Sequence, residues 1–133
     1  MTADRNSRKS KDPKRILRGK AAYRRGLRAE ALATLFLCLK AYRIVGQRVR
    51  TKAGEIDLIV RRGNVLVFVE VKARSGMADA AEALGHHQRQ RLARAASLFV
   101  ATRPAFQDFD MRFDIVLVAP YRWPHHIVDA WQT

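Results

Sequence analysis

Two carboxylates and a lysine lie at unusual positions in the most apolar part of this sequence. Asp57 falls in an alternating run at residues 55–60, and Glu70 and Lys72 fall in the hydrophobic run at residues 65–72. Interior strands of a sheet normally exclude charge, because burying an unpaired ion costs several kcal/mol. These three residues therefore mark either a functional site or a structural ion-pair cluster.

The spacing of these residues predicts that their side chains share one patch. Glu70 and Lys72 are two residues apart, so they project from the same face of an extended strand. Residues 62–64, Arg-Gly-Asn, are typical of a tight reversal, so residues 55–60 and 65–72 are expected to pair antiparallel. That pairing places Asp57 across from Glu70 or diagonal to it.

Such a patch suits the hydrolysis of phosphodiester bonds. Paired carboxylates and a backbone carbonyl, such as that of Val71, supply the hard oxygen ligands that Mg²⁺ or Mn²⁺ prefers. The cation would polarise the phosphate and lower the pKa of an attacking water, and Lys72 would stabilise the charge of the transition state. Glu30 could reach the patch from a preceding helix. From spacing alone, a structural ion-pair cluster remains the alternative.

The composition favours a polyanionic partner. The 133 residues include 26 Lys and Arg against 12 Asp and Glu, for a formal net charge of +14. Nucleic acid fits this excess, because each neutralised phosphate releases condensed counterions, although an acidic protein or a membrane surface would fit it too. No run approaches the roughly 18 apolar residues that span a bilayer, and no secretory signal is recognisable. The single cysteine excludes an internal disulfide, so a cytoplasmic location is expected.

Residues 1–17 are predicted to form a flexible basic tail. Residues 1–20 carry eight Lys and Arg and two Asp, with few large aliphatic residues. They bury too little apolar area to offset the entropy of ordering. A nucleic-acid-binding arm and a dispensable solubilising extension fit the tail equally well. Residues 18–133 are expected to form one domain.

Two helices are predicted from apolar residues at helical spacing. The first covers residues 26–40, with Glu30 near the edge of its buried stripe and Cys38 as a small core residue. That stripe is Leu27, Ala31, Leu35 and Cys38, widened by Leu32, Phe36 and Leu39. The second helix covers residues 80–101 and is regular from about residue 86. Its stripe is Leu84, Leu92, Ala95, Ala96 and Phe99.

Strands are predicted at residues 42–50, 55–60, 65–72 and 111–118, and residues 124–131 add a short edge strand or a final turn. In the second strand, Ile56, Leu58 and Val60 are expected to share one face. The order of helix, three strands, helix and strand predicts an α/β domain with a mixed central sheet flanked by helices.

The amino-acid sequences of the two charged strands resemble those of a known family. Residues 54–59, GEIDLI, followed by residues 67–74, VFVEVKAR, resemble the D…ExK signature of the restriction-endonuclease-like superfamily. More closely, the chain is similar to the YraN family of small bacterial proteins, which share the Holliday-junction-resolvase type of this fold. The similarity covers about residues 18–131 and includes Gly26 and Glu30, although Ala29 stands where a second glycine is usual.

The resemblance implies a role for each residue of the patch. Asp57 and Glu70 would bind the metal, Lys72 would be the catalytic lysine, and Glu30 would be the helical acid of the site. The implied activity is that of a Mg²⁺- or Mn²⁺-dependent endonuclease acting on branched or structured DNA, with DNA rather than RNA as partner and a homodimer by analogy with junction resolvases. Because a fold does not guarantee an activity, a binding module without turnover is the alternative, and a basic protein-interaction adaptor is the third possibility.

Other polar residues are weaker candidates. Gln88 stands where a lysine is common in these relatives and brings no charge, while Arg89, Arg91 and Arg94 either contact backbone phosphates or form a solvated helix face. The pairs at residues 86–87 and 125–126 are adjacent histidines that point apart, so no zinc site is expected. Asp114, in an apolar strand, is either a structural acid or a site residue.

Overall fold

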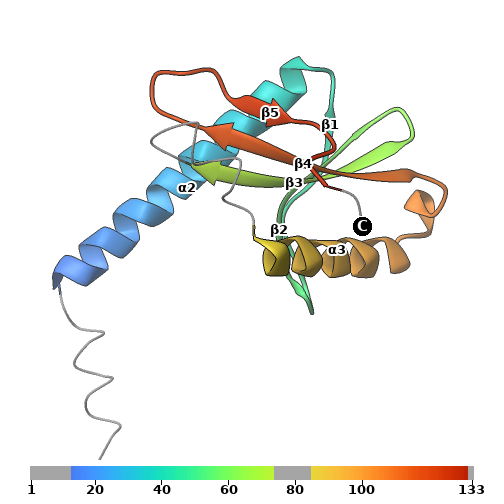
Figure 1. Ribbon diagram of the computed structural model, residues 1–133, viewed down its shortest axis with the longest axis horizontal. Coiled ribbons are helices and arrows are strands. Elements are labelled where there is room, and N and C mark those ends of the chain that lie inside the picture. Colours follow the sequence, from blue (N-terminus) through green and yellow to red (C-terminus); the bar gives the residue numbers. More distant parts are fainter. Residues whose placement is uncertain (1–12, 74–84, 132–133) are drawn as a thin grey trace, which may run out of the picture.

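The computed structural model describes residues 13–73 and 85–131, apart from the side chains of residues 15–25 (Figure 1). Residues 1–12, which make up most of the predicted tail, lie outside the described residues, as does the predicted start of the second helix at residues 80–84. Residues 13–17, the rest of the predicted tail, belong to a helix. None of the described helices is both long and apolar enough to cross a bilayer.

The predicted α/β fold with a mixed sheet is confirmed. Within the described residues, five strands are ordered β1-β2-β3-β4-β5 in space, and only the β3–β4 pair is parallel. A parallel pair needs a crossover, which here includes a helix and a short 3₁₀ turn, η1 (Pro104–Phe106). The strands are β1 (Arg43–Thr51), β2 (Gly54–Arg62), β3 (Val65–Ala73), β4 (Asp110–Val118) and β5 (His125–Ile127).

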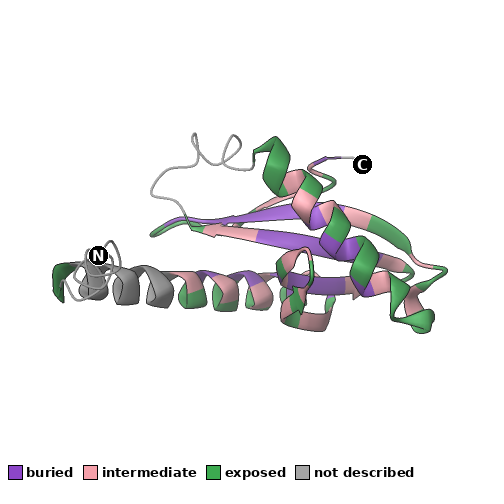
Figure 2. Cartoon of the chain, turned by 90° about the horizontal axis from the view of Figure 1, so that it is seen from below, coloured by how far each residue is buried: buried purple, intermediate pink, exposed green. Residues whose placement is uncertain are grey.

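Two helices cover opposite faces of the sheet, as Figure 2 shows. Helix α2 (Pro13–Leu39) packs on one face and α3 (His86–Ala101) on the other. The predicted α3 stripe is confirmed for the described residues, because its buried residues are Leu92, Ala95, Ala96 and Phe99. The α3-side core adds, among others, Ile56, Ile59, Leu66, Phe68 and Phe113. The α2-side core includes Leu58, Val60, Val67, Val69 and Val116.

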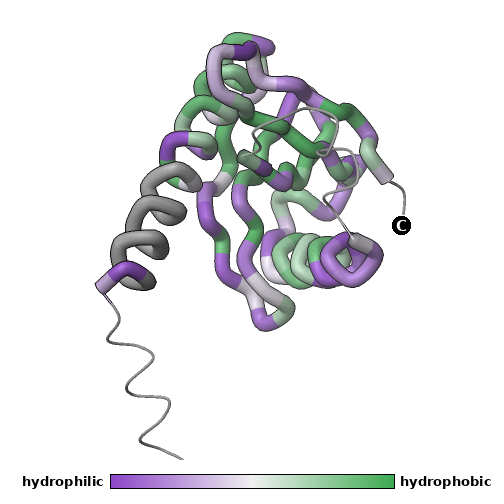
Figure 3. The backbone as a smooth tube through the Cα atoms, turned by 60° about the vertical axis from the view of Figure 1, so that its left-hand side comes forward, coloured by the Kyte–Doolittle hydropathy of each residue, from purple (hydrophilic) through white to green (hydrophobic). Residues whose placement is uncertain are grey.

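The predicted buried stripe of the first helix is wrong. The residues of α2 that face the sheet are Ala29, Ala33 and Leu37. Leu35 is 58% exposed, and Cys38 is exposed rather than a core residue. Figure 3 shows hydrophobic residues in the C-terminal turns of α2. These turns carry the exposed Leu32, Leu35 and Leu39 as well as the buried Leu37, so two faces are apolar. The helix turns its alanines to the sheet because small side chains let its backbone lie close, and it leaves leucines outside.

The side chains of β2 alternate between the two faces of the sheet, and this alternation is interrupted at Asp57. The prediction that Ile56 shares a face with Leu58 and Val60 is wrong, because Ile56 belongs to the α3-side core and the other two to the α2-side core. Across from Asp57, Arg48 of β1 has a φ of 50°, a left-handed backbone that is uncommon for a long side chain. Backbone strain of this kind accumulates at functional sites.

Candidate active site

The structure brings Asp57, Glu70 and Lys72 together. The β2–β3 pairing ends at Leu58–Val69, and Asp57 and Glu70 are the next residues beyond this pair on the two strands. The two carboxylates interact, in agreement with the prediction that Asp57 lies across from Glu70 or diagonal to it. The Val71 N–H donates a hydrogen bond of 3.0 Å to Oδ2 of Asp57. The Lys72 ammonium lies 3.3 Å from Oε1 of Glu70. Two carboxylates and an ammonium thus share the C-terminal end of β3.

The two carboxylates are held together at an electrostatic cost. Glu70 is only 6% exposed, and its Oε2 finds no hydrogen-bond partner among the residues that the structure describes. Burial, followed by the negative charge of Glu70, raises the pKa of Asp57 to about 7. The charge of Glu30 acts in the same direction, while the Val71 N–H opposes the rise. Shifts of this kind cluster where a fold keeps like charges together for a function.

Glu30 reaches the site from α2, and Arg48 meets it from β1. The guanidinium Nε of Arg48 donates to Oε2 of Glu30 at 2.6 Å. Glu30 is in place because its neighbour Ala29 packs on the sheet, which turns Glu30 toward β1. Sequence reasoning missed Arg48, because neither its type nor its spacing marks it. Its left-handed backbone and its position opposite Asp57 identify it only in three dimensions.

The donor set fits a divalent cation, although incompletely. Asp57 and Glu70 offer adjacent carboxylates, and the unpartnered Oε2 of Glu70 is the kind of buried atom that a cation would satisfy. Within residues 13–73 and 85–131, however, no three His, Cys, Asp or Glu side chains are grouped to hold one ion. Further ligands would have to be backbone, water or phosphate oxygens. Val71 contributes its N–H to Asp57, and its carbonyl as a ligand stays a prediction.

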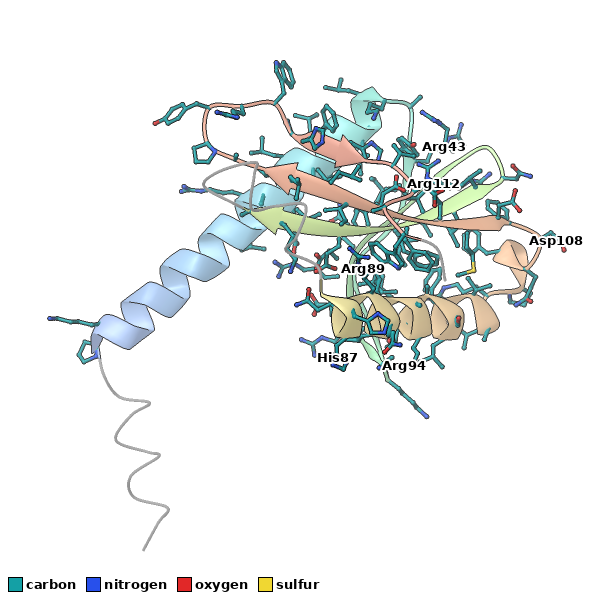
Figure 4. All side chains as sticks on the ribbon, in the orientation of Figure 1. Arg43, His87, Arg89, Arg94, Asp108 and Arg112 are labelled. Carbon is teal, nitrogen blue, oxygen red and sulfur yellow. The ribbon has the colours of Figure 1, made fainter. Side chains whose placement is uncertain are left out.

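The polar residues of α3 have different surroundings. Gln88 and Arg94 are exposed, so phosphate contact stays a prediction for them. Arg91 donates to the backbone carbonyl of Glu55 at 3.1 Å, which ties α3 to the start of β2. Arg89 lies between α3 and the sheet in Figure 4, with its guanidinium 5.8 Å from the ring centre of Trp131. The three arginines therefore do not form one uniform solvated face.

Asp114 belongs to a separate buried network with a structural role. Its carboxylate, fully buried, accepts hydrogen bonds from the Arg112 guanidinium at 2.9 and 2.8 Å and from the Asp129 N–H at 2.9 Å. Nε2 of His126 lies 2.6 Å from Asp114, and the Lys40 ammonium lies 2.7 Å from Nδ1 of the same ring. An ammonium can only donate, so His126 accepts at Nδ1 and donates from Nε2. The network joins β4, β5 and the end of α2.

Asp114→Asn is expected to lower the free energy of unfolding by about 3 kcal/mol near neutral pH, because it leaves the half-buried Arg112 beside a neutral amide. Burial by itself would raise the pKa of Asp114, but the hydrogen bonds from His126, Arg112 and Asp129 hold it at about 2. This lowered pKa stabilises the fold above the unfolded value of about 4, and the contribution is lost as the pH falls toward the folded value.

Urea unfolding followed by circular dichroism tests this expectation across that acidic range. The difference between wild type and Asp114→Asn should shrink as the pH falls from about 4 to the folded pKa. The control is Asp110→Asn, which changes an exposed acid of the same strand. A difference that stays constant over the whole range would show that the Asp114 carboxylate is not the stabilising group.

Comparison with known proteins places the site residues inside a shared sequence region. Residues 29–118 match the model of the uncharacterised protein family UPF0102, a range that includes Glu30, Asp57, Glu70 and Lys72. A UPF0102 protein of Parvibaculum lavamentivorans is 58% identical over 114 residues, which cover 86% of each chain. A UPF0102 protein of Mesorhizobium japonicum is 50% identical over 110 residues, which cover 83% of this chain and 88% of the relative.

Proposed function

The chain belongs to the UPF0102 family, which is the YraN family of the sequence resemblance, and from this premise we propose that it is a metal-dependent endonuclease of branched or structured DNA. The observation that carries the proposal is the Asp57–Glu70 pair. A fold that only needed stability would not keep two like charges together at the cost of a pKa raised to about 7. An ammonium beside this pair completes a set suited to phosphodiester hydrolysis.

Each residue has a distinct task in this proposal. Asp57 and Glu70 would hold the divalent cation, Mg²⁺ or Mn²⁺, which when bound polarises the scissile phosphate and lowers the pKa of a water. Lys72, held 3.3 Å from Glu70, stabilises the negative charge that develops on the phosphate oxygens. Glu30 adds a third negative charge nearby, and Arg48 neutralises it until substrate is bound.

The basic composition supplies the sequence-independent part of substrate binding. With a net charge of +14, the chain is expected to bind nucleic acid with an affinity that falls steeply as salt rises. In this proposal, Gln88 and Arg94, which are exposed on α3, contact backbone phosphates, which set the register of a substrate without reading its bases.

One observation favours the alternative of a nucleic-acid-binding module without turnover. Across the described ranges, no third acid joins Asp57 and Glu70 in a complete metal-binding group. A binding module would retain the salt-dependent affinity and lack cleavage.

Cleavage of labelled DNA distinguishes the two functions. Single-stranded, duplex, flap and four-way-junction DNA are incubated with the full-length protein in Mg²⁺, Mn²⁺ or EDTA. An endonuclease cleaves a branched substrate in the presence of a metal and not in EDTA. Tight, salt-sensitive binding with no cleavage of any substrate would establish the binding module instead.

Asp57→Asn is expected to stabilise the fold at alkaline pH. The folded pKa of Asp57 lies above its ordinary value of 3.8, at about 7, so ionising this carboxyl destabilises the native state. This destabilisation is absent at a pH below the ordinary pKa of the carboxyl and complete at a pH above its folded pKa. The variant should therefore gain about 1–3 kcal/mol over wild type near pH 8, and almost nothing near pH 4.

The gain is measured by urea unfolding at both pH values, with Asp108→Asn as a control for the loss of one exposed carboxylate. A variant less stable than wild type at alkaline pH would mean that Asp57 stabilises the fold, and the structural ion-pair interpretation would be right.

A further inference from the structure

A groove runs along α2 and includes the Asp57 side chain. It lies between α2 and β1 and encloses about 530 Å³. Its α2 wall is largely apolar, with Leu27, Ala31, Leu35 and Cys38, and the opposite wall includes Gln47 and Arg48. Leu27 and Leu35, two of the leucines that the sequence placed in the core, therefore line an open groove that includes Asp57 and Glu30.

The groove is long enough to hold a short segment of an extended strand. From Leu27 to Cys38 the helix rises about 16 Å, at 1.5 Å for each residue.

The chemistry of the walls matches an unpaired strand. Leu35, which is 58% exposed, presents an apolar surface against which a base or a sugar can pack. The exposed amide of Gln47 can both donate to and accept from a base edge that is no longer paired. Arg48 is the basic residue of the groove, and a phosphate can take the place of Glu30 as its partner.

We propose that this groove binds one unpaired strand of nucleic acid beside the phosphate that is cleaved. The proposal rests on the proposed nuclease function and narrows its substrates. It predicts a preference for DNA with an unpaired segment at the cleavage position, such as a flap or a splayed arm, over continuous duplex. A second copy of this chain packed on the same leucines is the competing occupant.

The native Cys38 reports occupancy of the groove without any catalysis. It is the single cysteine of the chain, it is exposed and it lines the groove. The rate at which N-ethylmaleimide alkylates the full-length protein is measured in EDTA with a short oligothymidylate or with a fully paired hairpin. At about nine times its Kd the single strand should slow alkylation about tenfold, because only the free fraction reacts. The hairpin should leave the rate unchanged.

A matched pair of variants locates the contact. Leu35→Glu should weaken oligothymidylate binding and remove the protection of Cys38. Leu32→Glu places the same charge on the same helix, at a residue that is 49% exposed and outside the groove, and should leave both unchanged. Equal effects of the two variants would overturn the proposal.

Three other results would also overturn it. They are equal protection by the hairpin, no protection by saturating single strand, and DNA-independent protection that grows with protein concentration. The last of these would assign the groove to a second copy. Because the assay contains EDTA, strand-specific protection in a protein that cleaves nothing would support the groove and reject only the nuclease function. Metal-dependent cleavage, with Cys38 equally reactive with the single strand, with the hairpin and without DNA, would support the nuclease function and reject the groove.

Discussion

Asp57→Asn is expected to slow metal-dependent DNA cleavage about 10³-fold or more, a loss of about 4 kcal/mol of transition-state stabilisation. The amide has one oxygen and no charge, so it is a poor ligand for a hard cation. That oxygen can still accept the hydrogen bond from Val71, so the strand geometry should be retained. The single-turnover cleavage of a labelled flap in Mn²⁺ measures the effect.

The control for this variant is Asp108→Asn, since Asp108 is exposed in the loop before β4 (Figure 4). DNA binding by Asp57→Asn should be equal to that of wild type or stronger, because one negative charge is removed from the site. Cleavage at the wild-type rate would exclude Asp57 from the reaction. A variant that does not fold would assign the cluster a structural role.

Lys72→Met is expected to lower turnover by about 10²–10³-fold, the usual cost of losing one group that stabilises transition-state charge. Methionine keeps much of the aliphatic length and removes the ammonium that lies 3.3 Å from Glu70. If Lys72 acts on the transition state, the single-turnover rate falls while the Kd for DNA stays nearly constant.

A structural role for Lys72 gives a different pattern. If the lysine only neutralises Glu70, Lys72→Met lowers the free energy of unfolding and leaves turnover of the folded protein unchanged. Lys72→Arg separates the two roles further, because it restores the charge with a different donor geometry. Partial rescue of turnover by arginine, with no change in stability, supports the catalytic role.

The central contact of the site was predictable because it is local. Residues 62–64 form a tight reversal, and a short turn fixes the register of its two strands. Glu70 and Lys72 share a face through the two-residue period of a strand. These two rules are enough to place Asp57 across from Glu70 or diagonal to it.

The orientation of α2 was not predictable by the same means. Apolar residues occur on two of its faces, so helical periodicity is present but does not say which face is buried. The sheet selected Ala29, Ala33 and Leu37, because alanines allow close packing and leave room for Glu30 to reach β1. Hydrophobicity alone favoured the leucines, of which Leu27 and Leu35 line the groove instead.

Arg48 and Asp114 were beyond sequence reasoning for another reason. Arginine does not favour a left-handed backbone, so no local feature of the sequence indicates the φ of 50° at Arg48. The partners of Asp114 include His126, 12 residues away, and, through it, Lys40, which is 86 residues from His126. Such contacts depend on the tertiary fold and carry no spacing signature.

Binding of Mn²⁺, followed by electron paramagnetic resonance, tests most directly whether the fold keeps Asp57 and Glu70 together to hold a cation. The full-length protein is titrated with Mn²⁺ beside Asp57→Asn, Glu70→Gln and the control Asp108→Asn. We expect saturable binding by wild type and by the control, and loss of this binding in both site variants. Equal binding by all four proteins, or no saturable binding by folded wild type, would contradict it.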